Sequence, residues 1–140
     1  MSQPEFVSDA FNLCERHAHF NEDGSVTLID AATLWSLPPE MMNAQFGRLL
    51  VSAFTFSENW PTWEMHPHGD EMVYLLSGRA TLILRLPQGD TEIALSANHG
   101  HIVPKGTWHT AHTAVPCQML IVTRGQDTEI ASVAEMAAAP

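Results

Sequence analysis

The sequence predicts an all-β domain, a sandwich or a barrel, and two observations favour this class. Short segments with apolar residues at alternate positions, such as SVTLID (25–30) and RATLILRL (79–86), follow one another at near-regular spacing. Turns that contain glycine or proline separate these segments, and no segment of helix length lies between them. At 140 residues, 45 % of them hydrophobic, the chain fits one domain with a core of its own.

The expected elements follow in chain order. Residues 1–20 read as an N-terminal extension, partly helical around SDAFNLCERHAHF, and SVTLID as the first strand. AATLWSLPPEMMNAQ is expected to form a short helix or an irregular connection, because Pro38 and Pro39 interrupt it. EMVYLLSG and RATLILRL are expected to pair as a hairpin about Ser77-Gly78. The remaining strand segments are GRLLVSAFTFS, TEIALSA, HIVPKGTWHTAHTA and CQMLIVTRG, followed by a short helix or a frayed tail.

The composition limits the class of partner. Six basic residues against sixteen acidic ones give a net charge of -10, which argues against nucleic acid, since phosphates need a basic surface. No apolar run approaches the roughly 20 residues of a membrane-spanning helix. The segment MSQPEFVSDAF has no signal-peptide pattern, so we expect a cytoplasmic protein. Cys14 and Cys117 fit no CxxC pattern and are expected to be reduced.

Strand parity makes four residues candidates for a metal site. Alternate residues of a strand share a face, so Glu64 and His66 in TWEMH point the same way and Trp63 points the other way. Glu71 opens the next strand, and His109 lies on a later one. If these strands are neighbours, two imidazoles and two carboxylates converge, a set that suits Zn, Fe(II), Mn, Ni or Co. The alternative is a set of polar rim residues satisfied by hydrogen bonds.

Other histidines are expected to lie outside such a site. The segment CERHAH (14–19) has metal-ligating residue types, but nothing nearby completes a tetrahedral set, so an exposed amphipathic segment is expected. His99 and His101 flank a turn and are expected to face solvent. His112 has the opposite parity from His109 and is expected to face away from the pocket.

Two patterns in the sequence resemble the motifs of the cupins. The first cupin motif reads roughly G-x5-H-x-H-x(3,4)-E-x6-G, and here Glu71 is followed by six residues and Gly78. The second reads roughly G-x5-P-x-G-x2-H-x3-N, and PKGTWH supplies Pro104, Gly106 and His109. The segments WEMHPHGDE, VPKGTWHTA and VTRGQDT look like those of small single-domain bacterial cupins.

This resemblance covers about residues 45–125 and implies a double-stranded β-helix, the jelly-roll barrel. It implies a single cupin domain over residues 1–140, with residues 1–20 as an N-terminal extension and 127–140 as a tail. It also implies a homodimer, since small cupins commonly pair through strands or sheet faces.

The sequence departs from the first motif at one ligand position. Counting back from Glu71, His66 fills the second histidine position, and Glu64 stands where the first histidine is expected. The alternative pair, His66 and His68, leaves only two residues before Glu71. The chain would then have to turn tightly while it directs three ligands to one point. We prefer the first registration.

Glutamate in place of histidine lowers the net charge of an M(II) site from +1 to zero and favours Mn or Fe(II) over Cu. Without a metal, Glu64 and Glu71 would repel each other, and one pKa should rise.

Three functions stay open. The first is a metal-dependent dioxygenase, isomerase or lyase on a small, mostly apolar organic molecule, with Tyr74 or His68 assisting. The second is a non-catalytic module that binds or senses a small ligand, and the third is a metal-free, vestigial barrel. Trp60, Trp63 and Trp108 are expected to fill the barrel, although one of them lining a ligand pocket is an alternative.

Overall fold

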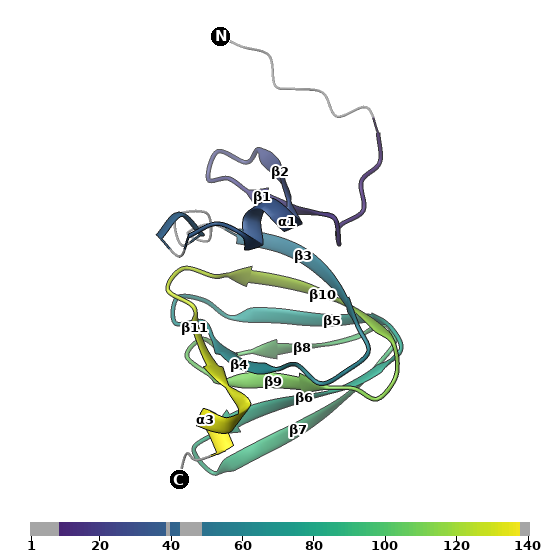
Figure 1. The fold of residues 1–140 in the computed structure, drawn as a ribbon, viewed down its shortest axis with the longest axis vertical. Helices are drawn as coiled ribbons and strands as arrows, with labels where there is room; N and C mark the ends of the chain where they lie inside the picture. The colour runs from purple at the N-terminus through teal and green to yellow at the C-terminus, as the bar shows by residue number, and fades with distance from the viewer. Residues whose placement is uncertain (1–8, 39, 43–48, 138–140) are drawn as a thin grey trace.

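The computed structural model describes residues 9–38, 40–42 and 49–137. Two antiparallel sheets fold over each other as a flattened barrel (Figure 1). One sheet has six strands in the order β2-β1-β3-β10-β5-β8, and the other has five in the order β11-β4-β9-β6-β7. The elements are β1 (Arg16–Phe20), β2 (Val26–Asp30), α1 (Ala31–Trp35), β3 (Leu49–Phe56), β4 (Thr62–Met65), β5 (Glu71–Ser77), β6 (Arg79–Leu86), β7 (Gly89–Ser96), β8 (His99–Val103), β9 (His109–His112), β10 (Cys117–Arg124), β11 (Glu129–Ser132) and α3 (Val133–Ala137). The predicted all-β jelly-roll class is confirmed.

The N-terminal segment differs from the prediction of a partly helical extension. Residues 16–20 form β1, which pairs with β2 on one side and β3 on the other and so continues the six-stranded sheet past the barrel (Figure 1). The predicted exposed amphipathic segment is therefore wrong, because His17 and His19 are both buried. The rings of Trp35 and Phe54 pack on His17, and a local reading of CERHAH does not reveal these contacts. The short helix expected after the first strand is α1.

The predicted hairpin between EMVYLLSG and RATLILRL is also wrong. β5 pairs with β10 and β8 in the six-stranded sheet, whereas β6 pairs with β7 and β9 in the other. Gly78 carries the chain across this corner with a φ of 84°. A Cβ atom at Gly78 would collide with the carbonyl oxygen of Pro116 and with Cys117, so the corner requires glycine.

The space between the sheets is packed at one end, which we call the filled half. Its core residues come from both sheets and are aliphatic or contain sulfur: Val73, Leu75, Leu82, Leu84, Leu95, Val103 and Met119. Most of them are inaccessible to solvent. The alternating pattern of the strands directs these side chains inward and supplies the hydrophobic stabilisation of the barrel.

The C-terminal segment forms the edge strand β11 of the five-stranded sheet and then the predicted short helix, α3, rather than a frayed tail. β11 pairs with β4, and Ile130 lies opposite Glu64 in the register. In α3, Met136 packs into a small apolar cluster with Trp63. Among the described residues, no helix is long and apolar enough to cross a membrane.

Candidate metal site

The four candidate ligands come from both sheets. Glu64 on β4 pairs directly with His109 on β9. His66 follows β4 immediately, and Glu71 is the first residue of β5 in the opposite sheet. The shared orientation predicted for Glu64 and His66 is confirmed, because both line one cavity, whereas Trp63 packs into a separate apolar cluster.

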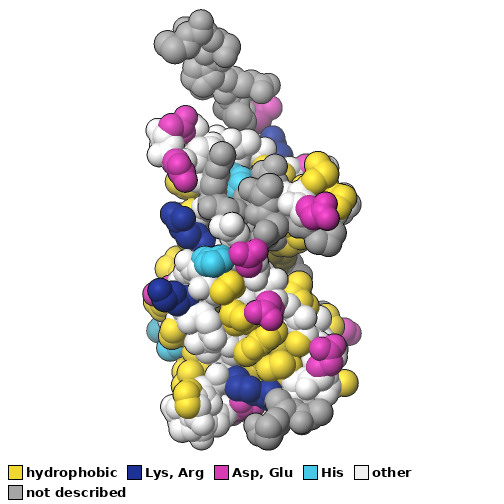
Figure 2. All heavy atoms as spheres, turned by 90° about the vertical axis from the view of Figure 1, so that its left-hand side faces the viewer, with side chains coloured by type: hydrophobic (Ala, Val, Ile, Leu, Met, Phe, Trp, Pro, Cys, Tyr) yellow, Lys and Arg dark blue, Asp and Glu magenta, His cyan; other side chains and the backbone are white. Residues whose placement is uncertain are grey.

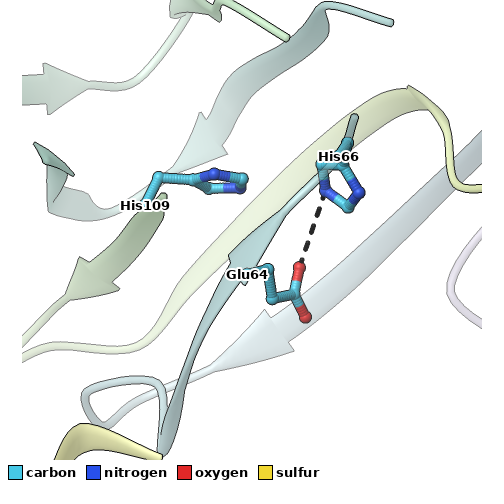
Figure 3. A group of neighbouring side chains, drawn as sticks. All are labelled: Glu64, His66 and His109. Carbon is cyan, nitrogen blue, oxygen red and sulfur yellow. Dashed lines mark ion pairs between the residues drawn. The ribbon is translucent and has the colours of Figure 1, made fainter. Parts of the chain in front are cut away.

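Three of these residues form a group that can hold a metal ion. Glu64, His66 and His109 each offer one ligand atom, and these atoms lie within 4.8 Å of one another (Figure 3). The Nε2 atom of His66 lies 3.9 Å from Oε2 of Glu64. Glu71 lies outside this group of three, yet its Oε2 is 2.7 Å from Nε2 of His66 and its Oε1 is 3.0 Å from Nε2 of His109. The structure thus brings all four predicted residues together.

Hydrogen bonds behind the two imidazoles set their tautomers. The Thr128 hydroxyl donates to the carbonyl oxygen of Gly125 at 2.7 Å, so its oxygen accepts from Nδ1–H of His66, also at 2.7 Å. Nδ1–H of His109 donates to the carbonyl oxygen of Thr107 at 3.0 Å. Both rings therefore carry a proton on Nδ1 and turn Nε2 toward Glu71. Metal-bound histidines have such a partner on the far ring nitrogen.

The contacts between the imidazoles and Glu71 are short but do not have hydrogen-bond geometry. Nε2 of His66, Nε2 of His109 and Oε1 of Glu71 are all buried, and none has a hydrogen-bond partner among the described residues. Buried polar atoms are seldom left unpaired, since their desolvation is then uncompensated. An ion between these atoms would satisfy them together, so the donor set fits a divalent metal.

The charges of the cluster are strongly coupled. Burial alone would raise the pKa of Glu71, but in the metal-free protein the imidazoles of His109 and His66, when protonated on Nε2 as well as Nδ1, outweigh this effect and hold that pKa at about 2. Burial raises the pKa of Glu64, and the neighbouring charge of Glu71 raises it further. The predicted rise of one carboxyl pKa is thus found at Glu64. Glu71 also outweighs the effect of burial on His109, whose pKa is raised.

The span of residues 56–123 matches the family of cupin domains. The chain belongs to the cupin superfamily. A cupin-2 domain protein from Shewanella frigidimarina has 21 % identity, coverage of 54 % of this chain and 69 % of its own, and a TM-score of 0.47. A cupin superfamily protein from Desulfitobacterium hafniense has 24 % identity, with 54 % and 66 % covered and a TM-score of 0.46.

The fold is also similar to that of oxalate decarboxylase, at 17 % identity and a TM-score of 0.50. The similarity covers 66 % of this chain and 26 % of that enzyme, and at this identity it shows the fold alone. No curated protein matches the sequence of this cupin.

A cavity of about 990 Å³ lies beside the cluster, in what we call the hollow half of this cupin. Its size is near the upper end of the range for small-molecule pockets, roughly 300–1,000 Å³. Glu64, His66 and Glu71 line one part of it, and the rest is mostly apolar. Glu64 is the most accessible of the three, with 32 % of its side chain exposed, whereas His66 and Glu71 are buried.

Other residues singled out from the sequence lie away from the cluster. Nε2 of His68 contacts Oδ2 of Asp127 at 2.8 Å on the surface, as expected for a histidine outside the ligand set. His112 is exposed, as its parity predicted. Tyr74 has the opposite parity from Glu71 and faces the outside of the six-stranded sheet, beside Gly100, so its suggested assistance is wrong.

Two residues near the site had no signal in the sequence. Thr128 fixes the His66 tautomer from 62 positions away, and no local pattern predicts that contact. Trp35 lines the cavity from α1, the short helix that was predicted as one of two alternatives but without any role at the site. Of the tryptophans considered, Trp60 lines the cavity, whereas Trp63 packs under the guanidinium of Arg85 at 4.5 Å.

Proposed function

We propose that Glu64, His66, Glu71 and His109 together hold one divalent metal ion, with Fe, Mn, Zn and Ni as the candidates. One observation carries this proposal: two buried imidazoles of fixed tautomer turn Nε2 toward a buried carboxylate without hydrogen-bonding to it. Nitrogen and oxygen donors in this combination suit borderline divalent ions.

We further propose that the protein acts on a small organic molecule as a metal-dependent dioxygenase, isomerase or lyase. When bound, the ion supplies a Lewis acid beside the cavity. The protein supplies the rest: Thr128 and Thr107 keep the imidazoles in the ligand tautomer. The apolar cavity walls exclude water from a bound molecule, and Glu64 is the most exposed of the three proposed ligands that line the cavity.

The raised pKa of Glu64 supports a second function. A carboxyl group with a raised pKa that faces a cavity is suited to give and take a proton as a general acid or base without a metal. The same cavity also suits a module that binds or senses a ligand without chemistry. Turnover of a panel of carbonyl, phenolic and sugar compounds separates an enzyme from such a module.

Elemental analysis tests the metal proposal on protein purified without added metal. We expect close to one equivalent of a divalent ion, or its uptake on addition of Mn, Fe(II), Zn or Ni. If none co-purifies and none binds, the metal proposal fails. His109→Ala should weaken binding by at least roughly 100-fold, since loss of a supporting residue alone costs about 10–100-fold. His112→Ala is the matched control, because His112 lies on the same strand and is exposed.

We also propose that the protein is a homodimer that pairs through the outer face of the six-stranded sheet. Apolar residues lie side by side across four strands of that face: Val51, Val122, Met72 and Ile102. Met72 and Ile102 are 36 % and 50 % exposed. Adjoining exposed apolar side chains mark interaction surfaces.

Light scattering over a concentration series tests the dimer. Ile102→Lys should give a monomer, whereas Ile130→Lys, on the other sheet at 64 % exposure, should leave the dimer intact. A monomeric wild-type protein would contradict the proposal. The cytoplasmic location stays a prediction, which the free thiols of Cys14 and Cys117 support.

A further inference from the structure

We propose that the cavity takes a neutral, flat and largely apolar molecule that hydrogen-bonds to Ser52 and Thr123. This inference deepens the proposed function and rests on it for the idea that the cavity holds a ligand. The observations that carry it are two hydroxyl groups in an apolar wall, a fixed aromatic surface, and the absence of cationic side chains from the described lining.

Ser52 and Thr123 lie on the inner faces of neighbouring strands. Thr123 on β10 pairs with Leu50 on β3, and Ile121 pairs with Ser52, so the two hydroxyl residues are diagonal neighbours. Both line the cavity, at 2 % exposure for Ser52 and 8 % for Thr123. Val122 on β10 pairs with Met72 on β5, and the strands are antiparallel. Thr123 therefore lies beside Glu71, the residue that precedes Met72.

The hydroxyl of Thr123 has no hydrogen-bond partner among the described residues. A buried hydroxyl without a partner weakens folding, and a valine would fill the same volume without that cost. A polar group on a bound molecule would supply the missing partner. The unpaired hydroxyl of Thr123 therefore indicates that the ligand carries a hydrogen-bonding group, which lies close to the metal-site cluster when the ligand is bound.

Aromatic rings form the wall beyond these hydroxyl groups. The rings of Phe54 and Trp35, both lining the cavity, are 6.0 Å apart with their planes inclined by 50°. Nε1–H of Trp35 donates to Nε2 of His17 at 3.0 Å, and Nδ1–H of His17 donates to the carbonyl oxygen of Leu13. His17 is buried, and burial lowers its pKa, so the neutral ring remains an acceptor for Trp35. Fixed aromatic faces favour a flat, apolar ligand.

The charges around the cavity disfavour anions. The acidic side chains that line it are Glu40, Glu64, Glu71 and Asp127, and no lysine or arginine is among its described lining residues. On the face on which β11 and α3 lie, acidic side chains and some lysine or arginine side chains are spread over the surface (Figure 2). A phosphate or sulfate ester would find no cationic side chain there to compensate its desolvation. The described lining residues therefore disfavour nucleotides and sugar phosphates as ligands.

Two matched probes test the inference in the metal-free protein, with a chelator present. Equilibrium dialysis at neutral pH compares 2-naphthol, which is neutral and flat, with 2-naphthyl phosphate, which has the same ring system and carries negative charge. We expect 2-naphthol to bind with a dissociation constant at least tenfold lower. Equal or tighter binding of the phosphate ester, or no binding of 2-naphthol, would overturn the inference.

Variants test the role of the hydroxyl group. Thr123→Val should bind 2-naphthol about fivefold more weakly, the effect of one net hydrogen bond, while its melting temperature stays the same or rises. Thr81→Val, on the five-stranded sheet outside the cavity, should bind as the wild type does. The probe 2-methylnaphthalene, which has no polar group, should bind wild type and Thr123→Val alike. Unchanged 2-naphthol binding by Thr123→Val would overturn the assignment.

The two proposals fail separately. If the protein binds 2-naphthol but takes up no metal, this inference stands and the metal proposal fails. If the protein takes up metal through His109 but binds no 2-naphthol, the metal proposal stands and the proposed ligand class is wrong.

Discussion

The filled and hollow halves of the barrel are built from the same strands and differ in what those strands direct inward. Along the inner face of β5, Leu75 and Val73 give way to Glu71. Along β10, Met119 is followed at alternate positions by Ile121 and then by Thr123. Stability and chemistry are thus separated along each strand rather than between strands. A change of one side chain should therefore have opposite consequences in the two halves.

The largest effect is expected in the filled half. Leu82→Ala removes a fully buried side chain from the core and should lower the free energy of unfolding by about 2–5 kcal/mol. Urea unfolding of the metal-free protein measures it. In the hollow half, Thr123→Val should leave that free energy unchanged or slightly higher. A similar loss from both variants would contradict the division into halves.

Acid should weaken the hollow half through Glu71. Folding lowers its pKa from 4.5 to about 2, so ionised Glu71 stabilises the metal-free protein above pH 4.5. That stabilisation, on the order of 3 kcal/mol, is lost as the pH falls from about 4.5 to about 2. Glu71→Gln should flatten the fall in unfolding free energy between pH 5 and pH 3.

Glu64→Gln should act in the other direction from Glu71→Gln. Because the folded pKa of Glu64 is raised, its protonation in acid favours the folded state, and the variant loses that compensation. The variant should therefore be more sensitive to acid than the wild type. Identical pH profiles for the two variants would show that the carboxyl groups are not coupled as described.

The chain corner at Gly78, which joins the two sheets, should be sensitive to the loss of glycine. Gly78→Ala introduces both an unfavourable positive φ and a collision with Pro116. Gly24→Ala introduces only the positive φ, since a Cβ there would meet nothing within 4 Å. Gly78→Ala should therefore be the more destabilising by about 1–3 kcal/mol, the usual cost of overpacking. Thermal unfolding of both variants measures the difference, and equal losses would mean that the corner can relax.

A smaller effect than the loss of a ligand is expected for the hydroxyl group of Thr128, which hydrogen-bonds to His66. Thr128→Val removes the acceptor of Nδ1–H of His66 and should weaken metal binding by about 10–100-fold, with little change in the fold. Calorimetric titration with Mn or Zn measures the affinity. Thr113→Val is the matched control, because the hydroxyl of Thr113 also donates to a backbone carbonyl oxygen, as that of Thr128 does, but lies outside the cavity lining. Wild-type affinity in Thr128→Val would place His66 outside the ligand set.

Local pattern in the sequence predicted a large part of the barrel and its site. Alternation located most strands, and parity placed Glu64 and His66 on one face and His112 on the other. These features depend only on the two-residue period of a strand. The resemblance to cupin motifs added the register in which Glu64 takes the place of a histidine, and the structure brings that residue to the cluster.

The errors have a common physical cause, which is pairing between distant segments. The hairpin expected about Gly78 has a suitable turn, but the partners of β5 and β6 come from residues 89–124 and decide that the two strands lie in different sheets. β1 lies beside β3, and His17 is buried because Trp35 and Phe54 pack against it, contacts that are invisible in CERHAH. The contact of Thr128 with His66 is long-range in the same sense.

The family match has a further consequence for the cavity. The matched span, 56–123, contains the four candidate ligands but stops short of Thr128 and omits the wall built from Trp35, Ser52 and Phe54. Grafting residues 56–123 into another cupin barrel would carry over the ligands and leave the wall behind. Thr123, by contrast, lies inside the matched span, so the cavity wall is built from residues on both sides of its N-terminal boundary.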